Sequence, residues 1–154
     1  MIVDGVPLSV ADHGGPGDPI LCLHAAGHGS RDFEPLVVRA AGRRRLITLD
    51  WPGHGRSGSD PVRAHASRYA DLLRGVLDAL SLERVVLLGN SVGGAAALEA
   101  AARDPSRVRA LVLVDCGGLA RPSVLVRAFT RAMAWVYRHP NAWWFPWFLS
   151  LIHI

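Results

Sequence analysis

The sequence predicts an α/β fold, with a mostly parallel, twisted sheet covered by helices on both faces. Four short runs of branched aliphatic residues lack polar alternation, which is typical of strands buried on both sides; they lie at 20–23, 46–49, 85–88 and 108–114. Segments with apolar residues at helical spacing alternate with them, at 32–43, 63–80 and 95–103. Strands that alternate with helices in this way form parallel sheets. Ahead of the sheet, residues 1–3 and 8–11 are expected to form a hairpin around Asp4-Gly5.

The composition is that of a globular chain and argues against several classes of function. Half of the 154 residues are hydrophobic, which excludes a disordered chain. All 17 basic residues are arginine, and the net charge of +4 comes from residues 121–154, which hold arginines but no acid. No basic stripe with interleaved aromatic residues crosses residues 1–120, so we expect no nucleic-acid partner. The N-terminus lacks the pattern of a signal peptide, which favours a cytoplasmic location.

The cysteines and histidines show no metal-binding pattern. Cys22 and Cys116 lie in or beside apolar runs, so both are expected to be buried thiols. No CxxC motif and no His/Cys ligand spacing is present. We therefore expect neither a metal nor another cofactor.

The stretch around Ser91 predicts a nucleophile. The strand at 85–88 leads into Gly89, Asn90 and Ser91, and Gly93 precedes an alanine-rich helical segment. An abrupt change from strand to helix would lift the Ser91 hydroxyl clear of the sheet, beside the next backbone N–H and the positive end of the helix dipole. The alternative is a plain turn in which Ser91 caps the helix. A dinucleotide phosphate loop is disfavoured because Gly-x-Gly-x-x-Gly is absent.

Polar and glycine-rich clusters follow all four aliphatic strands. They occupy residues 24–30, 50–58, 89–94 and 115–118. The carboxyl ends of parallel strands meet at one edge of a sheet, where ligands bind in such folds. The sequence therefore predicts one site at this edge, with a small-molecule substrate.

Three of these clusters resemble the landmarks of the α/β-hydrolase superfamily. They are residues 23–27, 50–57 and 89–94, in the order and spacing of the family, and the resemblance covers residues 1 to about 120. It implies that Ser91 is the nucleophile and that the backbone N–H groups of Ala26 and Val92 form the oxyanion hole. Here His24-Ala25 replaces the usual His-Gly pair, which alters the setting of the Ala26 amide.

The family order is serine, then acid, then histidine, so His24 and His54 come too early to be the base. We interpret both as loop histidines that hydrogen-bond backbone, and Asp50 as the group that fixes the following loop. Asp115 ends a strand and is a candidate acid, since a minority of the superfamily places its acid there. His139 follows it as a weaker candidate base.

The resemblance also implies that the chain is the N-terminal part of a larger hydrolase. The family fold needs roughly 250 residues, so the usual acid and histidine are expected beyond Ile154, and the fragment alone is expected to be inactive. Residues 150–154 resemble translated sequencing adapter and need not be native. We expect ester hydrolysis through an acyl-enzyme in the whole protein. Carbon–carbon bond hydrolysis is the alternative, and a non-catalytic binding protein on the same fold is a third hypothesis.

Residues 121–154 occupy the place where many family members insert a helical cap over the site. Apolar residues at 124–136 have helical spacing, and an aromatic cluster follows at 143–148. We interpret this second region as the start of a lid that lines the substrate site. Simple packing of the lid against the core is one alternative, and a basic helix lying on a membrane surface is another. The apolar run is too short to span a bilayer, and membrane contact is not expected.

Overall fold

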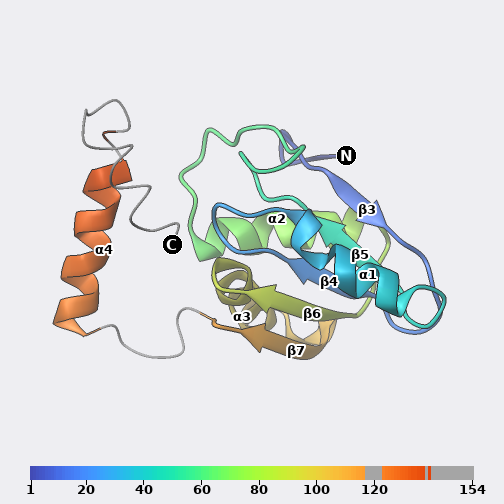
Figure 1. Cartoon of the computed structure of the whole chain (residues 1–154). Coiled ribbons are helices and arrows are strands. Elements are labelled where there is room, and N and C mark those ends of the chain that lie inside the picture. The colour runs from blue at the N-terminus through green and yellow to red at the C-terminus, as the bar shows by residue number, and fades with distance from the viewer. Residues whose placement is uncertain (117–122, 138, 140–154) are drawn as a thin grey trace. The chain divides into compact units, whose positions relative to one another are not determined.

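The computed structural model describes residues 1–116, 123–137 and 139. The chain divides into two units, Met1–Leu119 and Ala120–Ile154. The strands of the first unit are β1 (Ile2–Val3), β2 (Val6–Pro7), β3 (Val10–Asp12), β4 (Ile20–Leu23), β5 (Leu46–Leu49), β6 (Val85–Asn90) and β7 (Val108–Val114). Its helices are η1 (Ser30–Phe33), α1 (Glu34–Ala40), α2 (Ala66–Ala79), α3 (Val92–Arg103) and η2 (Pro105–Arg107) (Figure 1).

The four predicted aliphatic strands form one parallel sheet. The strand order is β3-β5-β4-β6-β7, and only β3 runs antiparallel to its neighbour. β4 therefore lies between β5 and β6, so the loops that follow these three strands emerge next to one another. The mostly parallel sheet expected from the sequence is confirmed.

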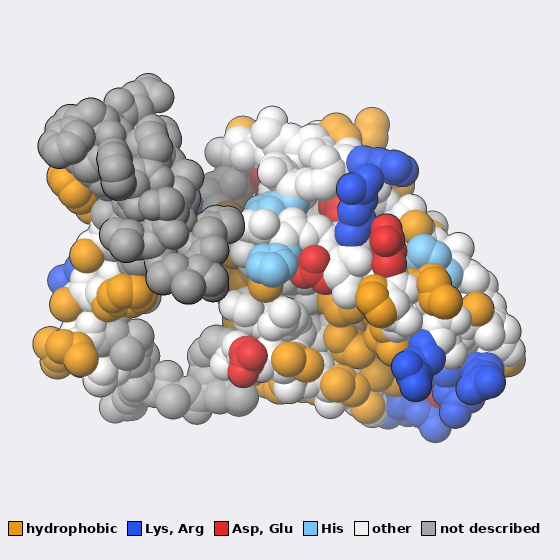
Figure 2. All heavy atoms as spheres, in the orientation of Figure 1, with side chains coloured by type: hydrophobic (Ala, Val, Ile, Leu, Met, Phe, Trp, Pro, Cys, Tyr) orange, Lys and Arg blue, Asp and Glu red, His pale blue; other side chains and the backbone are white. Residues whose placement is uncertain are grey.

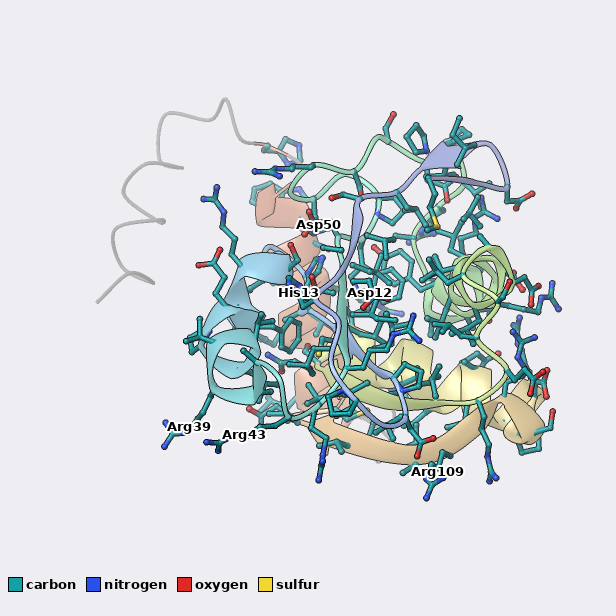
Figure 3. All side chains as sticks on the ribbon, turned by 90° about the vertical axis from the view of Figure 1, so that its right-hand side faces the viewer. Asp12, His13, Arg39, Arg43, Asp50 and Arg109 are labelled. Carbon is teal, nitrogen blue, oxygen red and sulfur yellow. The ribbon has the colours of Figure 1, made fainter. Side chains whose placement is uncertain are left out.

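Helices cover both faces of the sheet, as expected. Leu21 and Leu23 of β4 pack in the larger core cluster with α2 and α3, whereas Cys22 packs in a smaller cluster with Phe33 and Val37. Successive strand residues point to opposite faces, which is why the two clusters alternate along β4. Figure 3 shows α1 on one side of the sheet and α2 on the other.

The predicted N-terminal hairpin exists, but its second strand was placed wrongly. β1 pairs with β2 so that Val3 lies opposite Val6. The turn residues Asp4 and Gly5 have φ of 50° and 78°, the conformation of a two-residue hairpin turn, so the returning strand begins at once. The chain then continues into β3, which joins the main sheet beside β5.

The helices differ from the predicted ranges mainly at their N-terminal ends. The segment predicted at 32–43 is divided between η1 and α1. α2 begins at Ala66 because the side chain of His65 caps it, accepting from the Arg68 amide at 3.0 Å. Such a cap satisfies an amide that has no partner within the helix.

The described helix of the second unit is α4 (Val124–Tyr137). It confirms the helical spacing seen in this part of the sequence. The aromatic cluster at 143–148 and residues 150–154 lie outside the described residues, and the lid role of this region stays a prediction. Within the parts of the chain that the structure describes, no helix is both long and apolar enough to cross a bilayer.

Candidate active site

β6 and α3 meet at a sharp turn centred on Ser91. Its backbone has φ 51° and ψ −112°, a conformation that residues with a side chain rarely adopt and that the surroundings must stabilise. Its amide donates to the Val114 carbonyl at 2.9 Å, and its carbonyl accepts from the Ala95 amide at 3.1 Å. The side chain makes no capping hydrogen bond. Ser91 therefore occupies the N-cap position of α3, but its hydroxyl is not used for capping.

Glycines on either side of Ser91 allow α3 to begin this close to the sheet. A Cβ atom on Gly89 would lie 2.6 Å from the backbone of Gly93, and one on Gly93 would lie 2.2 Å from the carbonyl oxygen of Leu23. A Cβ atom on Gly94 would lie 2.8 Å from Sγ of Cys116. At Gly89 and Gly93 these atoms are backbone, so a larger residue there would force strand and helix apart, whereas at Gly94 the Cys116 side chain would have to move.

Two loops follow the neighbouring strands. The first loop (residues 24–30) follows β4, and the second loop (residues 50–58) follows β5. Ala26 is exposed in the first loop, and Val92 is half-buried at the start of α3. No turn, loop or cap hydrogen bond within residues 1–116 uses the amide of either residue. Both N–H groups can therefore donate to a ligand, although their joint role as an oxyanion hole stays a prediction.

His24 and His54 make hydrogen bonds to backbone, as the sequence analysis predicted. Nδ1 of His24 lies 2.7 Å from the Ala25 carbonyl oxygen, and its Nε2 accepts from the Trp51 amide at 2.9 Å. Nδ1 of His54 lies 2.9 Å from the Pro52 carbonyl oxygen, and its Nε2 accepts from the Gly27 amide at 3.1 Å. A nitrogen that accepts from an N–H carries no proton, so both rings are assigned the neutral Nδ1–H form.

Asp50 fixes the second loop and also binds the first. Its Oδ1 accepts from the Ser30 amide at 2.7 Å, and its Oδ2 accepts from the Arg56 amide at 3.0 Å. Burial raises the pKa of the Asp50 carboxyl, but the hydrogen bonds from Ser30 and Arg56 outweigh burial and bring the pKa below its ordinary value. Gly55 has φ +52°, and a Cβ atom there would lie 2.3 Å from Oδ2 of Asp50. The structural role predicted for Asp50 is confirmed.

The sequence analysis missed that the side chains of His24, Asp50 and His54 join the two loops to each other. It assigned each of them a local task. Glycines on both sides of His54 were the signal, because both adopt positive φ (73° for Gly53 and 52° for Gly55) and so let the backbone turn tightly around it.

Stability should depend on pH through His24. The ring is fully buried, and burial lowers the pKa of His24 from its ordinary value of 6.5. Below pH 6.5 the unfolded chain therefore binds a proton that the folded chain does not. The free energy of unfolding should fall as the pH drops below 6.5, by at most about 1.4 kcal/mol per pH unit, until the folded ring itself is protonated.

The measurement is urea unfolding between pH 7.5 and 5. His24→Gln is the matched control, because the glutamine oxygen can still accept from the Trp51 amide but does not titrate. In this variant, the free energy of unfolding should lose the part of its pH dependence that His24 causes. An unchanged slope would assign the pH dependence to other groups.

The two other candidate triad residues occupy different units. Asp115 is exposed, with φ 44°, directly after β7. The last residue of β7, Val114, pairs with Asn90, so Asp115 emerges one strand away from Ser91. His139 belongs to the second unit, where its Nδ1 lies 2.8 Å from the Trp135 carbonyl oxygen. The roles of Asp115 and His139 stay predictions.

Neither cysteine has the character of a nucleophile. Cys22 is fully buried, and burial raises the pKa of its thiol to about 12. Burial also raises the pKa of the Cys116 thiol, although that residue is only partly buried. A thiol in this state is not the reactive thiolate. In residues 1–116, 123–137 and 139, no three His, Cys, Asp or Glu side chains gather as metal ligands.

The arginines at the end of α1 lie apart from the polar groups of the two loops. A hollow of about 730 Å³ lies between the two loops and α1, and its lining includes Ser9, His13, Ser30, Thr48 and Arg56 but not Ser91. In Figure 3 Asp50 lies at one end of the sheet, whereas Arg39 and Arg43 lie at the other. Figure 2 shows one group of arginines at the lower right and another at the upper right, with histidines near the centre. Arg39 and Arg43 therefore lie away from Asp50, whereas Arg56 belongs to the second loop itself.

The comparison with known families decides the assignment of the fold. A sequence model of the α/β hydrolase fold matches residues 18–145. The chain belongs to the α/β-hydrolase fold family.

This α/β hydrolase is similar in sequence to proteins named as hydrolases of 2-hydroxy-6-oxo-dienedioates and -trienedioates. A protein named 2-hydroxy-6-oxononadienedioate/2-hydroxy-6-oxononatrienedioate hydrolase from Cupriavidus pinatubonensis is 40% identical over 143 residues, which are 84% of this chain and 47% of that protein. A protein of the same name from Paraburkholderia xenovorans is 40% identical over 149 residues, covering 88% of this chain and 50% of its own length. The chain spans about half the length of the curated relatives it matches.

Solved structures place the same fold in two kinds of hydrolase. A thermophilic esterase from Thermogutta terrifontis superposes with a TM-score of 0.78 at 27% identity, covering 94% of this chain and 52% of the esterase. A meta-cleavage product hydrolase from Pseudomonas fluorescens superposes with a TM-score of 0.69 at 26% identity, covering 76% of this chain and 44% of that hydrolase.

Proposed function

We propose that this chain carries the nucleophile and the oxyanion-binding amides of a serine hydrolase that attacks a carbonyl carbon. The observation that supports this most is the strained turn at Ser91, where the hydroxyl takes no part in capping α3. Backbone strain of this kind persists where the surroundings enforce it, and it is concentrated at functional sites. In the proposed reaction the Ser91 oxygen adds to the carbonyl carbon, and the carbonyl oxygen becomes an oxyanion.

The oxyanion would accept hydrogen bonds from the N–H groups of Ala26 and Val92. Both are backbone donors, so the alanine and valine side chains are compatible with the task. The N-terminal end of α3 adds a favourable dipole at the Val92 amide. A preorganised donor of this kind contributes about 3–4 kcal/mol to stabilising a transition state.

We propose that the general base comes from outside residues 1–116. The base must take the hydroxyl proton of Ser91 as the new carbon–oxygen bond forms. His24 and His54 use both ring nitrogens to hold backbone. His65 caps α2 and His13 lies 3.0 Å from the Thr48 hydroxyl. His28 pairs with Asp32 of η1 at 2.7 Å, but both residues of this exposed pair come before the serine in chain order.

Carbon–carbon bond hydrolysis of a 2-hydroxy-6-oxo-dienedioate is the reaction that the relatives favour. Two proteins with that substrate in their names are 40% identical to this chain, and a 2-hydroxymuconate semialdehyde hydrolase is 37% identical over 127 residues. The sequence around the nucleophile, Gly-Asn-Ser-Val-Gly-Gly at 89–94, resembles that group as well. The sequence analysis ranked ester hydrolysis first; the relatives move it to second place.

Ester hydrolysis stays the second candidate because the esterase from Thermogutta terrifontis superposes with a TM-score of 0.78. Both reactions begin with the same addition to a carbonyl carbon. They differ in the group that leaves, a carbanion in one case and an alkoxide in the other. The elements near Ser91 that this chain describes suit either reaction.

The test is an assay of the complete product of the reading frame that encodes this chain. It compares 2-hydroxy-6-oxononadienedioate with a p-nitrophenyl ester, and we expect kcat/KM to favour the dienedioate by at least about 100-fold. A preference for the ester would select the second candidate. Labelling by a fluorophosphonate, located on Ser91 by mass spectrometry, tests the nucleophile in either case. A product with neither turnover nor labelling would support the binding-protein hypothesis.

A further inference from the structure

Three hydrogen bonds join the first and second loops, and each involves a different part of the first loop. His24, at its start, accepts from the Trp51 amide. Asp50 accepts from the amide of Ser30, at its end. His54 accepts from the amide of Gly27, in its middle. The bridge made by His54 is therefore the one next to the proposed oxyanion donor, Ala26.

The hydrogen bond of His54 restricts the backbone on the carbonyl side of Ala26. The Gly27 N–H belongs to the same planar peptide group as the Ala26 carbonyl, so holding that N–H fixes ψ of Ala26. Gly27 has φ +75°, and the chain reverses there, with the His28 amide donating to the Ala25 carbonyl at 3.2 Å. Ala26, Gly27 and His28 are all exposed, so hydrogen bonds rather than packing hold this turn. The Ala26 N–H shares its peptide group with the Ala25 carbonyl, which lies 2.7 Å from Nδ1 of His24. His24 therefore holds the peptide group before Ala26, and His54 holds the one after it.

His54 itself is held in the orientation that this contact needs. Its Nδ1–H donates to the Pro52 carbonyl at 2.9 Å, two residues earlier in the same loop. That bond places the proton on Nδ1 and leaves Nε2 as an acceptor toward Gly27. The ring also lies against His24, with ring centroids 5.2 Å apart, and His24 is fully buried.

We propose that His54 is a positioning residue that, together with His24, sets the aim of the Ala26 amide toward the oxyanion. This inference rests on the proposed function, since it takes the Ala26 amide as an oxyanion donor. His54 touches neither substrate nor Ser91 in this role. Its effect is exerted on the transition state, because an oxyanion donor binds the developing charge more strongly than the ground-state carbonyl.

Two substitutions separate the two hydrogen bonds of the ring. In His54→Gln the amide oxygen reaches about as far as Nε2 and can still accept from the Gly27 amide. In His54→Asn the shorter amide can still donate to the Pro52 carbonyl but does not reach Gly27. If the contact with Gly27 sets the oxyanion donor, glutamine should rescue the function and asparagine should not.

The experiment measures kcat and KM for the complete product of the reading frame, with the substrate that the wild type turns over fastest. His54→Asn should lower kcat by about 10- to 100-fold and change KM less than about threefold, since a misaimed donor retains part of its effect. His54→Gln should stay within about threefold of the wild type. Equal kcat values for the asparagine variant and the wild type would overturn the proposal, and so would equal losses in both variants.

A spectroscopic measurement tests the geometry without any turnover. Imidazole ¹⁵N NMR of the wild type should show His54 as the Nδ1–H tautomer, and an Nε2–H tautomer would overturn the proposal even if the variants fail to fold. The Gly27 amide should exchange with solvent about as slowly in His54→Gln as in the wild type, and faster in His54→Asn.

Fluorophosphonate labelling distinguishes this inference from the proposed function. If Ser91 is labelled but His54→Asn retains full kcat, only the role of His54 is wrong. If Ser91 is never labelled and is not needed for turnover, the proposed function is wrong whatever the tautomer of His54.

Discussion

Replacing Ser91 with alanine should lower kcat/KM of the complete gene product by about 10⁴- to 10⁶-fold, the range seen when a serine hydrolase loses its nucleophile. The loss is chemical, because no other atom at this turn could form the covalent bond to the substrate. The amides of Ala26 and Val92 would remain, so a small rate above the uncatalysed reaction should persist. The measurement is steady-state kinetics on the substrate preferred by the wild type.

Ser81→Ala is the matched control for this prediction. Ser81 also has a positive φ, of 52°, and it is exposed in the turn after α2. Ser81→Ala therefore removes the same hydroxyl from a serine with the same positive φ, but at a position away from the Ser91 turn. Activity should stay within about twofold of the wild type, as expected for a surface position without special contacts. A Ser91→Ala variant that retains activity would remove the nucleophile assignment.

Replacing Trp51 with alanine should lower the free energy of unfolding by about 3–5 kcal/mol. The indole is fully buried and stacks on Tyr69, with ring centroids 4.3 Å apart and planes inclined by 4°. Its Nε1 donates to the His24 carbonyl at 3.1 Å. The variant would lose a large buried surface and leave that carbonyl without its donor. Because whole domains are stable by only about 5–15 kcal/mol, part of the population could unfold at 25 °C.

Urea unfolding followed by circular dichroism measures this effect, and two further variants divide it. Trp51→Phe keeps an aromatic ring on Tyr69 but removes the donor to His24, and should cost about 1–3 kcal/mol. Tyr69→Phe keeps the stacked ring and should cost less than about 1 kcal/mol. A loss below 1 kcal/mol for Trp51→Ala would show that neither the stacked ring nor the bond to His24 stabilises the fold.

Most of the fold near the site could be predicted from the sequence because its signals are local. A run of aliphatic residues without polar alternation identified each parallel strand, and the strand bounds at 20–23, 46–49 and 108–114 match the structure. The Ser91 turn was predictable because small residues flank it on both sides. The N-terminal hairpin was misplaced because the alternation in residues 6–12 fits one strand as well as the two, β2 and β3, that pair with different partners.

The sequence by itself determined the order of strands and helices, the serine at the turn from strand to helix, and the histidines and aspartate of the two loops. Only the tertiary structure decided which atoms these side chains contact. His54 and Gly27 are 27 residues apart, and so are His24 and Trp51. Contacts at such separations exist only once β4 and β5 pair in parallel and bring their two loops together. The aim of the first loop, unlike the presence of the nucleophile, is therefore a property of the folded sheet.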